Sequence, residues 1–412
     1  MMWNLVPLGT VCTVSSSKRI FAKEYRTEGI PFYRGKEVIE KHKGNPVSTE
    51  LFISKERYEE IRCKYDVPQI GDILLTSVGT LGVSWLVDET EFYFKDGNLT
   101  WLRAKDGLLN KFLYLWLNSD DAKHQIDMMC IGSTQKALTI ETINKFVIPL
   151  PSMQEQENIC AVIYPIIERI KNNRNINDNL QQQLSAIFRE WFIDAPESAE
   201  WPRGTFADLI DHTISGDWGK DTPTGNYTEM VYCIRGADIP EVKAGNKGKM
   251  PTRFILSKNY TAKKLVDGDI VVEISGGSPT QSTGRAAPVS ESLLGRYNRG
   301  MVCTNFCKAI KPKQGYSMFV YHYWQHLYDA GVFFGYENGT TGIKNLDING
   351  FIETEEIVIP PLNIVGRFDA VCQAIANKVY ANGLENERLA NLRDALLPKL
   401  MSGEIDVASI EI

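Results

Sequence analysis

The chain has 412 residues, enough for two or three domains that each bury a core. Hydrophobic residues make up 43% and charged residues 23%, a balance typical of a globular protein, and no apolar run is long enough for a transmembrane helix. The N-terminus lacks the basic and apolar regions of a signal peptide, and the eight cysteines are scattered. We therefore expect a cytoplasmic protein with reduced thiols and no membrane partner.

The net charge of −6 is unevenly distributed. Residues 1–150 contain 19 Lys and Arg against 19 Asp and Glu, whereas residues 151–200 contain 4 against 8. Residues 201–360 are again neutral, with 17 of each sign. A neutral domain can still present a basic face, so binding to nucleic acid stays open, and so does an ordinary mixed surface.

The second half of the chain repeats the first at an offset of about two hundred residues, which indicates two copies of one domain. Six short segments recur in the same order: Trp3–Gly9 with Trp201–Ala207, Arg34–Val38 with Arg235–Ile239, Gly71–Leu75 with Gly268–Val272, Phe112–Tyr114 with Phe319–Tyr321, Gly132–Thr134 with Gly339–Thr341, and Val147–Pro149 with Val358–Pro360. The stretches between them differ, for example 41–69 against 242–267. One scaffold with two variable surfaces favours two different recognition events; the alternative is an old duplication whose loops have drifted.

In the first copy, residues 1–150, Gly71–Leu75 predicts a turn that leads into a buried strand. Hydroxyl and glycine residues follow it, and a second such turn lies at 132–136; both could donate hydrogen bonds to phosphates or base edges. The candidate DNA-binding residues here are Lys18, Arg19, Arg34, Lys36, Ser77, Thr80, Ser133, Thr134, Gln135 and Lys136. Such residues are equally usual in tight turns.

The second copy, residues 197–360, contains matching turns and a cluster of basic and aromatic residues. Its candidates are Arg235, Ser275, Ser278, Arg285, Arg296, Tyr297, Arg299, Thr340, Thr341 and Lys344. Each cluster alone could be a solvated surface, but its occurrence in two matched copies favours binding.

Two long helices are predicted, one after each copy: the first at 151–196, and the second, followed by a C-terminal tail, within 361–412. Ser152 and Glu155 have the spacing of a capping box, and apolar residues then recur in heptads. Pro165 is expected to kink the first helix or delay its start, and Pro196 to mark its end. Gly403 is expected to terminate the second helix.

Each heptad stripe contains two Asn residues at the same spacing. If the helices are antiparallel, Asn173 would face Asn386 and Asn177 would face Asn382. Polar residues in a coiled-coil seam fix register at some cost in stability. The alternative is that these Asn face solvent on two independent helices.

Motifs for catalysis are not found in the sequence. It lacks a phosphate-binding loop, the Asn-Pro-Pro-aromatic box of amino methyltransferases and a Gly-x-Ser-x-Gly elbow. His322 and His326 are expected to flank an aromatic run on a core-facing helix rather than to bind metal. The pattern is typical of a binding protein.

Val147–Gln156, Gly132–Lys136 and Leu392–Ile405 together resemble conserved segments of the DNA-specificity subunits of type I restriction–modification systems. The resemblance implies an α+β fold in which two similar mixed α/β target-recognition domains, 1–150 and 197–360, are joined by two long antiparallel coiled-coil helices in a pseudo-two-fold repeat. It further implies a non-catalytic subunit that recognises a bipartite DNA site.

The same resemblance implies that two modification subunits methylate adenine and that restriction subunits can join them. S-adenosylmethionine, ATP and Mg would bind these partners, and no cofactor would bind this chain. The alternative function is a coiled-coil scaffold that binds proteins only.

Overall fold

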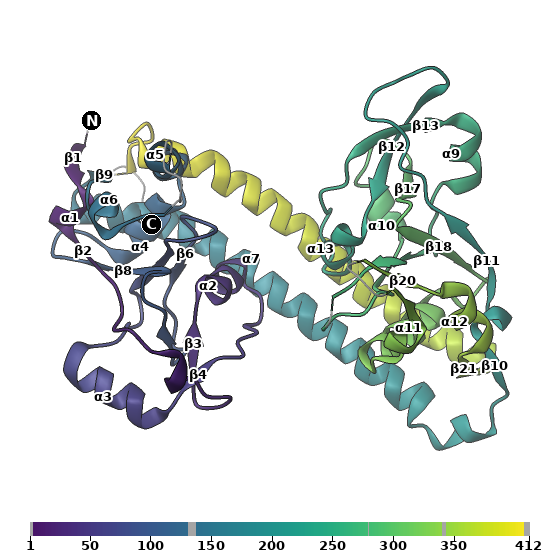
Figure 1. Ribbon diagram of the computed structural model, residues 1–412. Coiled ribbons are helices and arrows are strands. Elements are labelled where there is room, and N and C mark those ends of the chain that lie inside the picture. Colours follow the sequence, from purple (N-terminus) through teal and green to yellow (C-terminus); the bar gives the residue numbers. More distant parts are fainter. Residues whose placement is uncertain (1–2, 131–136, 279, 340–342, 408–412) are drawn as a thin grey trace. The chain divides into compact units, whose positions relative to one another are not determined.

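The computed structural model describes residues 3–130, 137–278, 280–339 and 343–407. It divides into two compact units: unit 1 comprises Met1–Lys171 with Leu389–Ile412, and unit 2 comprises Asn172–Arg388. Figure 1 shows that sheets and helices are mixed in both units, and that the two longest helices contribute to both. Among the described residues, no helix is long and apolar enough to cross a membrane.

Unit 1 contains one antiparallel four-stranded sheet of order β2-β8-β5-β6. A three-stranded sheet, β4-β3-β7, includes one parallel pair, β3 with β7, and β1 pairs with β9. Its elements are β1 (Asn4–Pro7), α1 (Leu8–Val11), β2 (Cys12–Ser15), η1 (Ala22–Glu24), β3 (Ile30–Tyr33), α2 (Gly35–Lys43), β4 (Phe52–Ile53), α3 (Lys55–Tyr65), β5 (Ile73–Thr76), β6 (Ser84–Leu86), β7 (Tyr93–Phe94), β8 (Leu99–Ala104), α4 (Asn110–Leu117), α5 (Asp120–Cys130), α6 (Ile140–Asn144) and β9 (Val147–Leu150).

Unit 2 repeats this topology, which confirms the predicted duplication. Its four-stranded sheet is β11-β18-β14-β16, its three-stranded sheet β13-β12-β17 has the parallel pair β12 with β17, and β10 pairs with β21. Its elements are η3 (Pro196–Glu200), β10 (Arg203–Thr205), η4 (Phe206–Asp208), β11 (Ile210–Ser215), β12 (Tyr227–Ile234), η5 (Gly236–Asp238), α8 (Ile239–Lys243), β13 (Thr252–Leu256), α9 (Ser257–Lys263), β14 (Ile270–Glu273), β15 (Ser275–Gly276), β16 (Ala286–Pro288), α10 (Glu291–Leu294), β17 (Met301–Cys303), β18 (Cys307–Pro312), α11 (Ser317–Asp329), η6 (Val332–Tyr336), β19 (Glu337–Asn338), β20 (Lys344–Leu346), α12 (Ile348–Thr354) and β21 (Glu356–Val358).

The repeated Gly-Asp turn explains why the central strands are so similar. Gly71 and Gly268 have φ values of 90° and 87°, a conformation that favours glycine. The next residue, Asp72 or Asp269, is buried and accepts a backbone N–H from the turn that precedes it, Gln69 N or Val266 N, both at 2.8 Å. The strands that follow, β5 and β14, are buried along their whole length, as predicted.

The long helix α7 (Met153–Phe188) begins with the predicted capping box. Ser152 N donates to Glu155 Oε2 at 2.8 Å, and Glu155 N donates to Ser152 Oγ at 3.3 Å. The expectation that Pro165 delays the helix is wrong, because α7 starts at Met153 and continues through Pro165. The α-helix ends at Phe188 rather than at Pro196, and a π-helical turn, η2 (Arg189–Ile193), follows it.

The second long helix, α13 (Leu362–Met401), ends as predicted, with Gly403 at a φ of 72°. Both long helices are part of the cores rather than separate from them. In unit 1, Ile159 and Ile163 of α7 pack with Leu397 and Leu400 of α13 and with α4. In unit 2, α7 and α13 contribute to an aromatic core around Phe188, Phe319 and Phe368.

In unit 2 the two helices run antiparallel, and their Asn residues meet in the pairs expected from the spacing. Asn173 Nδ2 donates to Asn386 Oδ1 at 3.0 Å, and Asn382 Nδ2 donates to Asn177 Oδ1 at 2.7 Å. All four side chains are buried. Because each buried amide has a partner, the layers avoid most of the desolvation cost of a buried polar group.

Candidate nucleic-acid interface

In unit 1 the first predicted polar turn lies beside the residues that follow the second one. Val78 forms an isolated antiparallel bridge with Ala137, and Leu138 N donates to Ser77 O at 2.9 Å. The hydroxyl segment Ser77–Thr80 therefore borders Ala137 and Leu138. The candidates that precede them in the chain lie outside the described residues: Ser133, Thr134, Gln135 and Lys136. Val78 and Thr80 are exposed at this edge. Ser77 is 3% exposed and its hydroxyl is 2.6 Å from Thr100 Oγ1, so its side chain is used inside the unit.

The matching edge of unit 2 has the same pairing, built into a small sheet, β15-β20-β19. Ser275 pairs with Asn345 and Gly276 with Lys344, and Leu346 N donates to Ile274 O at 2.8 Å. Ser275 Oγ donates to Asn345 Oδ1 at 2.5 Å. Ser278 is partly exposed and its hydroxyl accepts Gln281 N at 3.0 Å, which closes a turn. Thr340 and Thr341 lie outside the described residues.

Lys344 has a close acidic partner at this edge. Its Nζ donates to Glu337 Oε2 at 2.6 Å and lies 5.1 Å from the ring centroid of Phe334. Burial alone would raise the pKa of Glu337, but hydrogen bonds from Lys344 and Thr283 outweigh it and hold the pKa below its ordinary value. A DNA phosphate would therefore have to compete with Glu337 for the ammonium group.

Arg34 and Arg235 occupy matched places, and each binds a carboxylate in the first turn of the helix that follows it, α2 or η5. Arg34 Nη2 donates to the buried Glu37 at 2.9 Å, and Arg235 Nε donates to Asp238 Oδ2 at 2.9 Å. In each case the backbone N–H of the arginine also binds that carboxylate. Each side chain keeps about a third of its surface exposed, 35% and 37%. An acidic residue three positions after each arginine is the signal in the sequence that indicates this structural use.

The four residues of the basic and aromatic cluster in the second copy serve different contacts. Arg285 makes two hydrogen bonds to Glu273, at 2.7 and 2.8 Å. Arg296 is 9% exposed, and its guanidinium donates to Gly245 O and to Glu387 Oε2. The Tyr297 hydroxyl donates to Lys247 O at 2.5 Å, and Arg299 is exposed to solvent.

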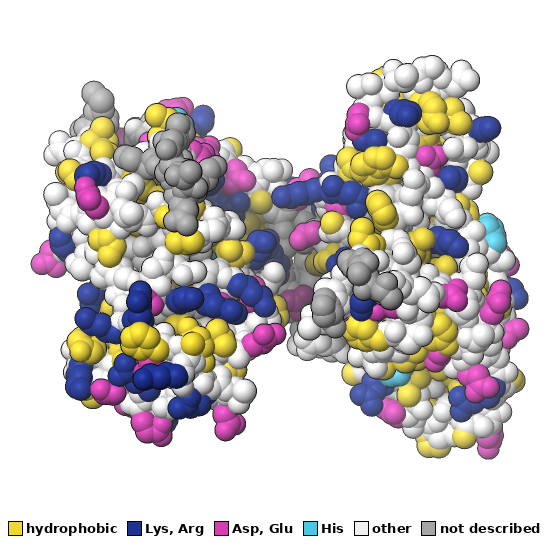
Figure 2. Space-filling view, in the orientation of Figure 1, with side chains coloured by type: hydrophobic (Ala, Val, Ile, Leu, Met, Phe, Trp, Pro, Cys, Tyr) yellow, Lys and Arg dark blue, Asp and Glu magenta, His cyan; other side chains and the backbone are white. Residues whose placement is uncertain are grey.

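The exposed rings of Tyr65 and Phe21 in unit 1 were not anticipated from the sequence. In unit 1, Lys18 Nζ lies 4.5 Å from the ring centroid of Tyr65, which is 53% exposed, and Phe21 is 56% exposed. Arg19 is well exposed and pairs with Asp96 at 2.9 Å, whereas Lys36 Nζ donates to Ser48 O at 3.2 Å. Figure 2 shows Lys and Arg side chains among hydrophobic ones over this part of unit 1, near α3 and β4. Rings and cations of this kind can stack on bases and neutralise phosphates.

Unit 2 has comparable rings on its surface. Arg253 lies 4.1 Å from the ring centroid of Trp218, and Phe306 is 59% exposed. The backbone oxygen of Phe306 accepts Ile274 N at 2.9 Å, so the backbone of this residue lies beside the residue that precedes β15. Exposure depends on tertiary packing, which the sequence pattern does not specify for single aromatic residues.

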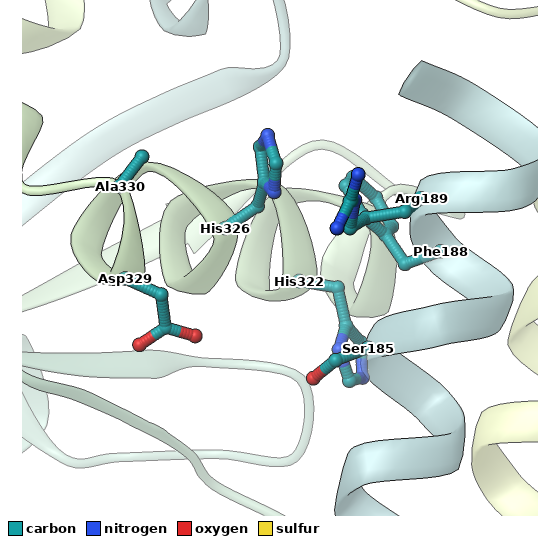
Figure 3. A pocket seen from close by; sticks show the side chains of 7 residues that line it. All are labelled: Ser185, Phe188, Arg189, His322, His326, Asp329 and Ala330. Atoms are coloured by element: carbon teal, nitrogen blue, oxygen red, sulfur yellow. The ribbon is translucent and has the colours of Figure 1, made fainter. Parts of the chain in front are cut away.

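A cavity of about 290 Å³ opens between the end of α7 and α11, within unit 2. Figure 3 shows His322 and His326 on α11 facing Phe188, the last residue of α7, and Arg189, the first residue of η2. Burial lowers the pKa of His322 to about 3, and its Nε2 has no hydrogen-bond partner among the described residues. Within those residues, no group of three His, Cys, Asp or Glu side chains is arranged to hold a metal ion.

Known proteins resemble this chain in sequence and in fold. Residues 2–182 match the type I restriction modification DNA specificity domain. The chain is 25% identical to the MjaIX type I restriction enzyme specificity subunit of Methanocaldococcus jannaschii over 84% of its length and 81% of the relative's. It is 22% identical to the HindI type I restriction enzyme specificity subunit of Haemophilus influenzae, over 72% and 78% of the two chains.

Among solved structures, the crystal structure of a type I restriction–modification S subunit from M. genitalium has the same fold, with a TM-score of 0.57 at 15% identity over 97% of this chain and 96% of that one. The first copy of the repeat thus matches the DNA specificity domain, and most of the chain is similar to the specificity subunits of type I restriction enzymes.

Proposed function

We propose that this chain recognises a bipartite site in double-stranded DNA, one half with each unit, and directs adenine methylation and restriction by partner subunits. The observation that supports this most directly is the repeated topology with different connecting segments. The strand order and the Gly-Asp turn recur, whereas α3 has 11 residues and its counterpart α9 has 7. The same scaffold would thus present two different surfaces to two DNA sequences.

The DNA-facing surface of each unit is proposed to include the paired polar edge and the exposed rings near it. In unit 1 this surface comprises Thr80, Lys18 and Tyr65, together with the turn at 133–136. In unit 2 it comprises Ser275, Lys344 and Phe306, together with Thr340 and Thr341. Hydroxyls and cations would position the phosphates, and amides such as Gln135 would contact base edges.

The helices α7 and α13 are proposed to set the spacing between the two half-sites. A helix of 40 residues such as α13 rises about 60 Å, which is enough to determine a separation on DNA. The buried Asn pairs fix the register of the two helices in unit 2. A slip by one heptad would leave these amides without partners, so a single register is favoured.

Exposed apolar side chains on these helices support docking of modification subunits. Ile176 on α7 is 41% exposed, and Leu384 and Leu392 on α13 are 38% and 48% exposed. Two modification subunits are proposed to cover such positions, and restriction subunits to join them. S-adenosylmethionine, ATP and Mg would bind those partners, and the complex would act in the cytoplasm, where its DNA target lies.

A gel-shift experiment separates this proposal from a scaffold that binds proteins only. The purified chain is mixed with a pool of random duplexes, alone and with modification subunits, and bound DNA is recovered and sequenced. Enrichment of two short motifs at a constant separation supports the proposal. Capture of modification subunits without any enriched DNA motif would favour the scaffold.

A further inference from the structure

We infer that residues 243–247 of unit 2, here called the locking loop, fix the rotational setting of the second recognition module on the helix pair and thereby limit the permitted spacer between half-sites. This inference rests on the proposed bipartite function. The locking loop begins at Lys243, the last residue of α8 in the module, and it contacts both α7 and α13 within unit 2.

Three successive carbonyl groups of the locking loop each receive a side-chain donor. Gln181 of α7 donates to Lys243 O. Asn177 Nδ2 donates to Ala244 O at 3.0 Å, and Arg296 Nη1 donates to Gly245 O at 2.7 Å. A run of three fixed carbonyls leaves the loop little freedom to slide along the helices.

Asn177 links the locking loop to the Asn layer of the helix pair. Its Oδ1 accepts Asn382 Nδ2 at 2.7 Å, while its Nδ2 donates to Ala244 O and, at 3.1 Å, to Val379 O of α13. The side chain is 1% exposed. The same residue therefore pairs the two helices and holds the module, so helix register and module position are coupled.

Two glycines allow the backbones to approach more closely than other residues would permit. A Cβ atom on Gly383 of α13 would overlap the carbonyl oxygen of Gly245. A Cβ atom on Gly245, whose φ is 80°, would overlap the carbonyl oxygen of Val379. Gly383 lies inside α13, where glycine disfavours the helix, so its presence is explained by this contact rather than by helix stability.

Arg296 connects the locking loop to α13. Besides Gly245 O, its guanidinium donates to Glu387 Oε2 of α13 at 2.7 Å, and its side chain is 9% exposed. Lys243, at the start of the loop, is anchored to α11 through Gln325 at 2.6 Å. At the offset that relates Asn173 to Asn382, Gly383 corresponds to Arg174, so the first copy does not repeat the glycine.

The test uses Gly383→Ala in the full complex with modification subunits. Gly366→Ala is the matched control, because it lies on the same helix and a Cβ there has no described atom within 4 Å. Methylation is measured on duplexes that contain both half-sites, found first from the wild-type complex, at the native spacer and at spacers one base pair shorter and longer. Thermal melting of each variant is measured in parallel.

We expect Gly366→Ala to keep the wild-type spacer preference and to raise the melting temperature by roughly 2–4 °C. Gly383→Ala should lower the melting temperature, recognise the same half-sites, and reduce the preference for the native spacer on the order of tenfold. If Gly383→Ala does not fold, Arg296→Gln takes its place, with the same expected loss of spacer preference.

The inference is overturned if Gly383→Ala, or Arg296→Gln in its place, keeps the wild-type spacer preference. A higher melting temperature for Gly383→Ala, equal to that of Gly366→Ala, would also contradict it. These results would leave the bipartite function intact. A wild-type complex that methylates no bipartite motif would instead refute the proposed function, and the inference with it.

Discussion

Units 1 and 2 share their strand order but differ in how their polar edges are built. Among the described residues of unit 1, the bridge of Val78 with Ala137 joins the two segments, whereas in unit 2 a three-stranded sheet, β15-β20-β19, joins them. The buried Gly-Asp turns are alike in both. Buried contacts restrict which residues can change, whereas an exposed edge can be rebuilt without loss of the core. Recognition can therefore diverge between two copies of one scaffold.

The largest effect should come from exchanging a whole unit's variable surface. Grafting residues 1–150 onto a homologue should transfer one half of the recognised site and leave the other half unchanged, because each unit has its own core. Methylation motifs of parent and hybrid, determined by sequencing, check this. A hybrid with a wholly new site, or with the parental one, would show that the units do not act as modules.

A second comparison concerns the matched aspartates. Asp269 is buried beside Lys311, so Asp269→Ala leaves a largely buried ammonium group unpaired and should cost on the order of 3 kcal/mol of unfolding free energy. Asp72 accepts Trp101 Nε1 at 2.8 Å, so Asp72→Ala removes a neutral partner and should cost about 1–2 kcal/mol. Denaturant unfolding of both variants measures the difference, and equal losses would contradict the stated reason.

His322 should make unit 2 sensitive to acid. Its pKa is about 3 in the folded chain and about 6.5 when unfolded, so the unfolded state binds more protons between these values and stability falls as the pH drops below 6.5. At pH 5 the loss should be about 2 kcal/mol relative to pH 7. His322→Phe should remove this loss, whereas His212→Gln, at an exposed position, should not. Thermal melting of the wild type and of both variants at pH 5 and pH 7 tests this prediction.

The two Asn layers should respond differently to Leu. Replacing Asn173 and Asn386 together should raise stability by about 1 kcal/mol and weaken the register, as for other buried polar pairs in coiled coils. Replacing Asn177 and Asn382 should lower stability, because Ala244 O and Val379 O lose a donor. Thermal melting and the oligomeric state of each variant test this. If both double replacements raised the stability and neither variant formed oligomers, a role of the Asn layers in the helix register would be contradicted.

Features set by local or periodic patterns were predictable from the sequence. The duplication, the Ser152–Glu155 cap, the end of α13 and the Asn pairs all depend on residues at short or regular spacing. The contacts of single charged residues were not predictable, since the partner of Lys344 is fixed by how β19 folds back on β20. The burial of Ser77 and Arg296 and the exposure of Tyr65 likewise depend on packing between distant segments.

The smallest effect is expected for the matched lysines. Lys136→Ala should weaken binding to all duplexes. It should also reduce the slope of the logarithm of the binding constant against the logarithm of the salt concentration by about 0.9, the value for one phosphate contact. Lys344→Ala should have a weaker effect, because Glu337 already neutralises that ammonium group. Binding titrations over a range of salt concentrations measure both slopes. If both variants kept the wild-type affinity and salt dependence, these lysines would not contact DNA phosphates.

The central claim, that one chain recognises two DNA half-sites at a set distance, is tested most directly by sequencing the methylated adenines of a host with and without this chain. The account predicts that one bipartite motif with a constant spacer is methylated only when the chain is present. An undivided motif, or a methylation pattern that does not depend on the chain, would contradict it.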